Sequence, residues 1–168
     1  MLPDAAGAAD ADAADVEAVT LLLGRAPRCA FRVVRRDAAG EPLVIENAPL
    51  LDDGTPMPTR FWLVGRRAVR DVSRLESTGG ARRAEAEVPA DAVADAHARC
   101  ARERDAHLPR GWAGPRPSGG VAGTRQGVKC LHAHVAWHLV GGDDPVGRWV
   151  AEQLAATGAD LCAAVSDS

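Results

Sequence analysis

Apolar residues recur at spacings of three and four in several segments of the chain, and they form short runs in others. The helical spacing predicts helices with one inward face, at residues 15–24, 66–77, 89–108, 128–139 and 146–157. Runs rich in β-branched and apolar residues predict strands at residues 29–36, 43–47 and 59–64, and a weaker strand at 84–88. The pattern predicts an α+β fold in which a small three- or four-stranded antiparallel sheet packs with about five helices.

Turn and loop signals separate these elements. Asp, Gly and Pro at residues 37–42 predict a hairpin turn, and three prolines exclude a helix from residues 49–58. Asp15 is the expected N-cap of the first helix. A Gly- and Pro-rich stretch predicts a long loop at residues 109–127. Residues 1–14 are expected to be a disordered tail and 158–168 a flexible one, which leaves a single domain at residues 15–157.

Composition and charge exclude some classes of function. The 168 residues carry a formal net charge of −3 with both signs mixed, so we expect no nucleic-acid partner. The basic residues are 19 arginines and one lysine, which we attribute to a GC-rich genome rather than to phosphate recognition. No apolar run approaches the roughly 18 residues that span a bilayer, and the first residues lack signal-peptide features, so we expect a cytoplasmic protein without a membrane span. Its four cysteines are then thiols or metal ligands rather than disulfides.

The helix expected at residues 89–108 places reactive side chains on its inward face. His97, Cys100 and Arg104 fall on this face together with apolar residues. A buried arginine needs a charged or hydrogen-bonding partner. His97 and Arg104 are therefore either part of a site, or a hydrogen-bonded core histidine and an arginine whose charged end reaches solvent.

The strongest chemical signal lies in residues 127–147, which hold three of the five histidines, one cysteine and the only lysine. In a helical projection Cys130, His134 and His138 line one edge of the apolar stripe, and His132 lies on the other edge. Residues four apart can hold one ion, but residues eight apart are separated by about 12 Å along the axis. A zinc ion would take at most two of the three, either Cys130 with His134 or His134 with His138.

The other ligands of such a site would come from elsewhere in the fold. The suppliers that we consider are His97, Cys100, Asp143 and Asp144. Asp144 has a structural explanation as well, because it suits the N-cap of the last helix with Pro145 at the first helical position. Two alternatives to a metal remain open: histidines that only pack and hydrogen-bond at a helix interface, and metal-free acid–base chemistry.

Three sequence blocks in order carry a resemblance to a known family. They are residues 53–63 (DGTPMPTRFWL), 72–76 (VSRLE) and 128–134 (VKCLHAH), the last followed by two glycines at 141–142 and DPVG at 144–147. Over most of its length the chain resembles the bacterial domain-of-unknown-function family 501 (DUF501), common in actinobacteria. The resemblance implies a cytoplasmic single-domain protein and brings no established activity. Genes of this family often lie near those for a cell-division septum protein and an exopolyphosphatase-like enzyme.

The resemblance also bears on the cysteines. Many relatives carry cysteine at the position of Asp37 and again near Gly65, and neither cysteine is present in this chain. If a family metal site used those thiols with Cys130, this chain has lost ligands or uses Asp37 in place of one.

Two functions from different classes follow. In the first, two helices form a pocket that holds a small anionic ligand through Arg104, and a histidine or a metal-bound water transfers protons. The residues assigned to that chemistry are His97, Arg104, His134 and His138, with Cys130, His134 and His138 as candidate zinc ligands. In the second, the protein is a non-catalytic module that binds a cell-division or envelope partner through exposed tryptophans, and the histidines are structural.

Overall fold

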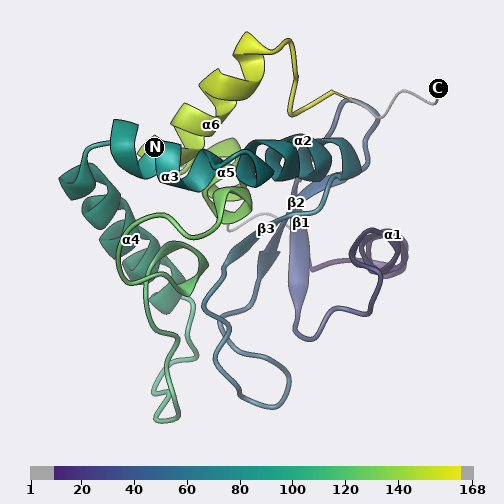
Figure 1. Cartoon of the computed structure of the whole chain (residues 1–168). Helices are drawn as coiled ribbons and strands as arrows, with labels where there is room; N and C mark the ends of the chain where they lie inside the picture. Colours follow the sequence, from purple (N-terminus) through teal and green to yellow (C-terminus); the bar gives the residue numbers. More distant parts are fainter. Residues whose placement is uncertain (1–9, 164–168) are drawn as a thin grey trace.

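The computed structural model describes residues 10–163, which form six α-helices around a three-stranded antiparallel sheet (Figure 1). The predicted α+β class is confirmed. The elements in chain order are α1 (Ala13–Leu23), β1 (Phe31–Arg36), β2 (Pro42–Asn47), β3 (Phe61–Leu63), α2 (Arg66–Ser77), α3 (Gly80–Glu87), α4 (Ala90–Asp105), the 3-10 turn η2 (Val121–Gly123), α5 (Leu131–Leu139) and α6 (Pro145–Ala156).

The sheet has the order β1-β2-β3, and every residue of the central strand β2 is buried. Neighbouring residues of β2 serve two apolar clusters because successive side chains point to opposite faces. Ile45 packs with Val19 of α1, whereas Val44 belongs to the main core shared with α2, α4, α5 and α6. The sheet therefore separates α1 from the other helices, as Figure 1 shows.

Residues 84–88, predicted as a weak strand, lie mostly in α3, and this prediction was wrong. Ala84 is fully buried one helical turn after Gly80, so its burial reflects a period of four rather than strand alternation. The Ala, Arg and Glu residues of this segment are also strong helix formers. Residues 84–88 are too few to distinguish helical spacing from the alternation of a strand.

Two helices begin at residues other than those predicted. Asp12 rather than Asp15 caps α1, because its side chain accepts a hydrogen bond from the Asp15 N–H at 2.8 Å. The helix predicted at residues 128–139 begins only at Leu131, since Cys130 is its extended N-cap residue (φ −139°, ψ 108°). Residues 1–9 of the predicted tail lie outside the described residues.

The segment after α6 packs on the rest of the fold as far as it is described. Leu161 is buried in the main core. The Ala38 N–H in the hairpin turn donates a hydrogen bond to the Cys162 carbonyl at 2.9 Å. Residues 158–163 thus join the end of α6 to the β1–β2 hairpin.

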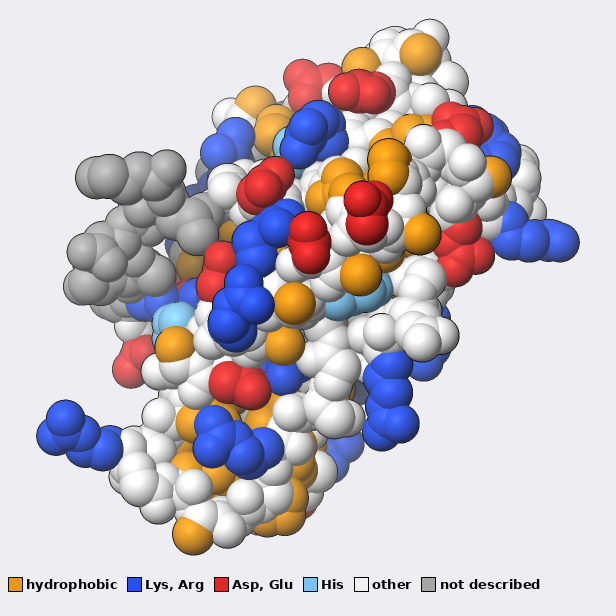
Figure 2. All heavy atoms as spheres, turned by 90° about the vertical axis from the view of Figure 1, so that its left-hand side faces the viewer, with side chains coloured by type: hydrophobic (Ala, Val, Ile, Leu, Met, Phe, Trp, Pro, Cys, Tyr) orange, Lys and Arg blue, Asp and Glu red, His pale blue; other side chains and the backbone are white. Residues whose placement is uncertain are grey.

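The surface on the side of α3 and α4 mixes both signs of charge. Figure 2 shows arginine and carboxylate side chains interleaved across this face, without a broad region of one sign. Within residues 10–163, no helix combines the length and the apolar character that a membrane crossing requires.

Helices α5 and α6 approach each other closely at Gly147, in the first turn of α6. A Cβ atom added at Gly147 would lie 2.5 Å from the backbone oxygen of His134 and 2.5 Å from the His138 Cβ. Backbone atoms of α5 cannot yield without moving the helix. The absence of a side chain at residue 147 therefore sets the distance between the two helices.

Replacing Gly147 with alanine should destabilise the protein. Glycine to alanine within an exposed helix usually stabilises by up to about 1 kcal/mol, but overpacking here should outweigh that gain and cost about 1–3 kcal/mol net. Urea unfolding of both proteins measures the difference. The converse change Ala155→Gly, on the exposed side of α6, should cost only about 1 kcal/mol or less. An unchanged or higher free energy of unfolding for Gly147→Ala would contradict the close approach.

Candidate functional site

His134 and Asp144 form a fully buried pair between α5 and α6. The His134 Nδ1–H donates to Asp144 Oδ2 at 2.7 Å, and both residues are 0% exposed. The other carboxylate oxygen accepts from the N–H groups of Val146 and Gly147 at 2.9 and 3.1 Å. Asp144 is therefore the N-cap of α6, as predicted, with Pro145 at the first helical position. The pair leaves one buried polar atom, His134 Nε2, without a hydrogen-bond partner within the described residues.

His97 lies beside this pair, with its ring centroid 5.7 Å from that of His134. Its Nδ1 accepts from the Val121 N–H at 3.1 Å, and its Nε2 donates to the Gly127 carbonyl at 2.8 Å. Both ring nitrogens are thus engaged with backbone groups of the 109–127 segment. The structure does bring His97 and His134 together, as the two-helix pocket requires, but His97 has no nitrogen left for a ligand.

Arg104 is buried, with 2% of its surface exposed. Its N–H groups donate to three backbone carbonyls and to one neighbouring carboxylate. The guanidinium donates to the carbonyls of Pro58, Pro117 and Gly119 at 3.2, 3.3 and 2.9 Å. It also donates from Nε to Asp105 Oδ1 at 2.9 Å. The partners that a buried arginine needs are present, and they tie the long loop to α4 and to the segment before β3.

His138 is the most accessible of the four residues assigned to the predicted pocket, which are His97, Arg104, His134 and His138. It is partly buried near the end of α5. Burial lowers the pKa of its imidazole, and the nearby Asp144 carboxylate opposes that shift. No described group of three metal-ligating side chains contains His134 or His138. The predicted strip of Cys130, His134 and His138 is also incorrect in one respect, because Cys130 precedes the helix and does not follow its projection.

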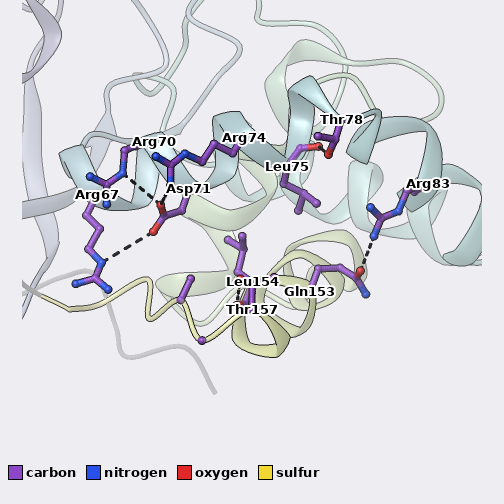
Figure 3. A pocket seen from close by; sticks show the side chains of 12 residues that line it. Arg67, Arg70, Asp71, Arg74, Leu75, Thr78, Arg83, Gln153, Leu154 and Thr157 are labelled. Atoms are coloured by element: carbon purple, nitrogen blue, oxygen red, sulfur yellow. Dashed lines mark hydrogen bonds and ion pairs between the residues drawn. The ribbon is translucent and has the colours of Figure 1, made fainter.

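Several arginine side chains gather at a surface cleft, away from the anion site predicted at Arg104. The cleft lies between α2, α3 and the C-terminal end of α6, and Figure 3 shows guanidinium groups at both of its ends. Its arginines are Arg67, Arg70, Arg74 and Arg83. Arg104, which the sequence assigned to an anionic ligand, is not among them.

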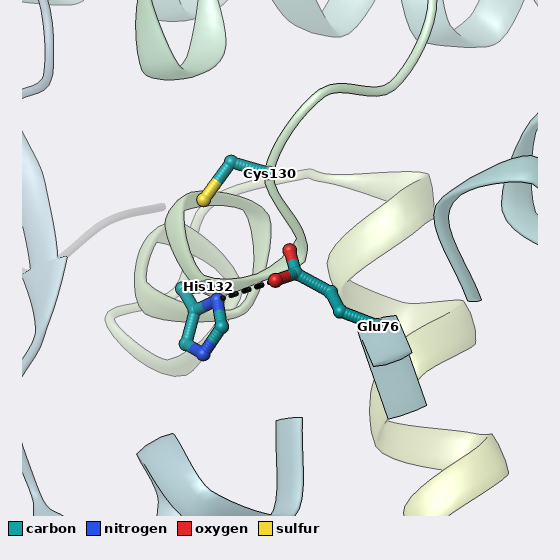
Figure 4. A group of neighbouring side chains, drawn as sticks. All are labelled: Glu76, Cys130 and His132. Atoms are coloured by element: carbon teal, nitrogen blue, oxygen red, sulfur yellow. Dashed lines mark ion pairs between the residues drawn. The ribbon is translucent and has the colours of Figure 1, made fainter. Parts of the chain in front are cut away.

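A compact group of metal-ligating side chains forms on the side of α5 that faces α2. It consists of Glu76, Cys130 and His132 (Figure 4), and one ligand atom from each lies within 4.8 Å of the other two. His132 Nδ1 is 3.2 Å from Glu76 Oε2. All three side chains are partly exposed, so the group opens to solvent. We call it the Glu76–Cys130–His132 cluster.

Backbone groups fix the orientation of each member of the cluster. His132 Nε2 lies 3.0 Å from the Ser73 hydroxyl and 3.3 Å from the Val69 carbonyl, and Nδ1 faces Glu76. The carbonyl can only accept, so its hydrogen bond with His132 requires the proton on Nε2. Glu76 Oε1 accepts from the Leu131 N–H at 2.6 Å. The Cys130 sulfur accepts from the backbone N–H of Ala133. The first turn of α5 thus binds both the thiol and the carboxylate.

The contacts of the cluster shift Cys130 toward the thiolate and His132 toward the imidazolium. Burial disfavours the Cys130 thiolate, but hydrogen bonds from His132 and from the Ala133 N–H outweigh it and hold the pKa of this thiol below its ordinary value. Burial likewise disfavours the charged form of His132, and the contacts with Cys130 and Glu76 raise the pKa of its imidazole nonetheless. In contrast, burial raises the pKa of Cys100 to about 12, which makes that thiol unreactive.

Sequence reasoning set His132 apart from the other histidines but did not assign it a partner, and it missed Glu76. One signal was available. Glu76 lies in the last turn of α2, where a carboxylate is unfavourable next to the negative end of the helix dipole. Such a local conflict suggests a tertiary partner. The structure supplies one, because Glu76 binds the positive N-terminus of α5.

The positions at which relatives carry cysteine lie at the other end of α2. Asp37 and Gly65 line one cavity of about 320 Å3 with residues of α1 and the hairpin turn. Glu76 lies eleven residues beyond Gly65, about 16 Å along the helix. Thiols at residues 37 and 65 would lie near each other rather than near Cys130.

None of the four tryptophans is exposed. Trp137 and Trp149 are buried in the main core. Trp62 is partly buried against the cluster around α1, and Trp112 donates its Nε1–H to the Pro115 carbonyl at 2.9 Å. The anchors that we assigned to a protein partner therefore contribute to packing.

Arg104→Met should destabilise the protein by about 2–4 kcal/mol. The methionine keeps an apolar stem but leaves one buried carbonyl, two partly buried carbonyls and Asp105 without this donor. Chemical denaturation measures the loss, and limited proteolysis should show earlier cleavage within residues 109–127. Arg102→Met, an exposed change on the same helix turn, should stay within about 0.5 kcal/mol of the parent protein. Equal stability of the two variants would contradict the structural role of Arg104.

Comparison with known proteins identifies a family of unknown function. No curated protein and no solved structure matches the chain. Residues 33–152 match the family described as "Protein of unknown function (DUF501)", and this span covers most of the chain and includes all three members of the Glu76–Cys130–His132 cluster. The chain therefore belongs to the DUF501 family.

Proposed function

We propose that the protein binds a zinc ion through Glu76, Cys130 and His132 and that the remaining coordination position is open to solvent. The observation that carries the proposal is the convergence of one carboxylate oxygen, one sulfur and one imidazole nitrogen within 4.8 Å. These three donor types are the ones that zinc takes in proteins. The residues come from two elements of the fold, the end of α2 and the start of α5, so the site exists only in the folded chain.

The spacing suits a tetrahedral ion. Zinc bonds of about 2.3 Å to sulfur and about 2.0–2.1 Å to nitrogen or oxygen place neighbouring ligand atoms roughly 3.3–3.7 Å apart. The Nδ1 of His132 and Oε2 of Glu76 are 3.2 Å apart already. Side-chain movements of about 1 Å, within ordinary rotamer motion, bring the sulfur to the same separation.

Hydrogen bonds that orient the three candidate ligands favour a metal site over a chance cluster. A metal-bound histidine usually donates its second ring N–H to a carbonyl or carboxylate, and ligating carboxylates are hydrogen-bonded in turn. Here His132 Nε2 faces the Val69 carbonyl, and the outer oxygen of Glu76 accepts from Leu131. The ligand atoms themselves thereby point toward a common centre.

Three protein ligands and a partly exposed position are typical of catalytic rather than closed structural zinc sites. When bound there, zinc lowers the pKa of a coordinated water to about 7 and polarises a substrate oxygen. The residues of this chain hold the ion and keep one side open. The proposal accordingly belongs to the hydrolytic class, with a small anionic ligand as the expected substrate. It also retains the predicted cytoplasmic location, where a reducing environment keeps Cys130 as a thiol.

Metal content tests the proposal. Protein purified without a histidine tag and dialysed against zinc should retain about one zinc per chain. Cys130→Ser and His132→Gln should each reduce this severalfold, as measured by elemental analysis. Cobalt loaded in place of zinc should show a thiolate-to-metal charge-transfer absorption that Cys130→Ser removes. At zinc concentrations about 100-fold above the dissociation constant, the folded state should gain about 2.7 kcal/mol.

Matched variants distinguish the Glu76–Cys130–His132 cluster from the His134–His138 pair as the metal site. Cys162→Ser and His138→Gln change one thiol and one imidazole outside the cluster and should keep the zinc. Loss of metal in His138→Gln but not in His132→Gln would instead support the His134–His138 pair. Absence of stoichiometric metal from wild-type protein would sink the zinc proposal.

A metal-free thiol nucleophile is the second candidate. The observation that favours it is the position of Cys130 at the N-terminus of α5 with His132 as its adjacent base, while Glu76 contacts the Nδ1 of that base. In metal-free protein, Cys130 should react with iodoacetamide at a pH below the 8.5 or so of an ordinary thiol. His132→Gln should move that pH profile upward, because the imidazolium no longer stabilises the thiolate. Alkylation of Cys130 at the same rate and pH in both proteins would reject this role.

A role in binding a cell-division or envelope partner stays a prediction. A pull-down from the host with wild-type protein, compared with Trp112→Ala, addresses it.

A further inference from the structure

The arginine cleft introduced above lies on a different stripe of α2 from the zinc site. Val69, Ser73 and Glu76 turn toward His132, whereas the cleft is lined by residues at positions 67, 70, 71, 74, 75 and 78. Both sets have helical spacing, so they mark two faces of one helix. None of the three proposed zinc ligands lines the cleft. Its chemistry is therefore independent of the zinc proposal.

The charges of the cleft are strongly unbalanced. Among the described residues, four arginines and one carboxylate, that of Asp71, line the cleft. Asp71 lies 3.9, 3.4 and 3.8 Å from the guanidiniums of Arg67, Arg70 and Arg74, which are long contacts for ion pairs. The single negative charge of Asp71 balances at most one of these three positive charges. The whole chain carries a net charge of −3, so this local excess is opposite in sign to the charge of the chain.

Arg83 stands at the opposite end of the cleft, held in place by neutral groups. Its Nη2 donates to Gln153 Oε1 at 2.5 Å, and its guanidinium lies 5.4 Å from the centroid of the Trp149 ring. Between the two ends the floor is apolar, formed by Leu75 and Leu154 (Figure 3). The cleft thus offers cationic groups at both ends and an apolar surface between them.

We infer that this cleft binds a small organic phosphate that carries at least two negative charges. A guanidinium fork matches the geometry of phosphate oxygens and can bind them bidentately. A volume of about 640 Å3 falls within the range of small-molecule sites. The floor formed by Leu75 and Leu154 accommodates the organic part, while a second anionic group would reach the other end.

Calorimetric titration at constant ionic strength tests the inference with three probes: adenosine diphosphate, pyrophosphate and inorganic phosphate. Adenosine diphosphate should bind most tightly, and inorganic phosphate most weakly. The double variant Arg70→Gln/Arg74→Gln should weaken binding of adenosine diphosphate about ten- to hundredfold, since each lost guanidinium removes a charge-assisted hydrogen bond that salt screens in part. These two side chains are 55% and 74% exposed, so the variant should fold.

The control variant Arg110→Gln/Arg125→Gln removes the same charge from two exposed loop positions outside the cleft. It should bind adenosine diphosphate as the wild type does. Thermal unfolding verifies that both variants fold. No binding of any probe by wild-type protein, or equal weakening by both variants, would overturn the inference. Binding of pyrophosphate as tight as that of adenosine diphosphate would overturn the role of the apolar floor.

Discussion

The buried carboxylate of Asp144 fixes the relation between the two helices on which the site geometry depends. One of its oxygens caps α6, and the other accepts from His134 of α5. A fully buried carboxylate is costly unless every oxygen is hydrogen-bonded, so this pairing admits little variation in geometry. With Gly147 allowing close approach, the pair sets both the separation of the helices and the rotation of α5 about its axis.

That rotation determines the role of the other histidine of the VKCLHAH block. Residues two apart on a helix point about 200° apart, so an inward His134 directs His132 to the opposite side, against α2. There His132 meets Glu76, and Cys130 lies at the N-terminus of the same helix. The fully buried His134–Asp144 pair joins α5 to α6. The partly exposed Glu76–Cys130–His132 cluster carries the chemistry that we propose.

Two of the buried polar side chains, His97 and Arg104, hold the long loop at residues 109–127 in place. Both nitrogens of His97 bind backbone groups of the 109–127 segment, and Arg104 binds two of its carbonyls. A loop of this length has few backbone partners of its own, and buried side chains with several donors supply them. Helix α2 contributes to two polar surfaces on different faces. One faces α5 and holds the Glu76–Cys130–His132 cluster, and the other faces α6 and forms the arginine cleft.

The sequence alone determined the α+β class, most of the helices and strands, the position of His97 and Arg104 on an inward helix face, and the capping role of Asp144, because these follow from local periodicity and turn chemistry. It did not determine that residues 84–87 are helical, since the run of five residues at 84–88 fits two periods. The angular order of His132 and His134 around α5 was also readable from the sequence. Which neighbour each one faces was not, because a projection gives directions relative to the helix and not to the fold. Only the tertiary structure brought Glu76 to the N-terminus of α5 and separated Cys130 from His134 and His138, because these contacts depend on how α2 and α6 pack against α5.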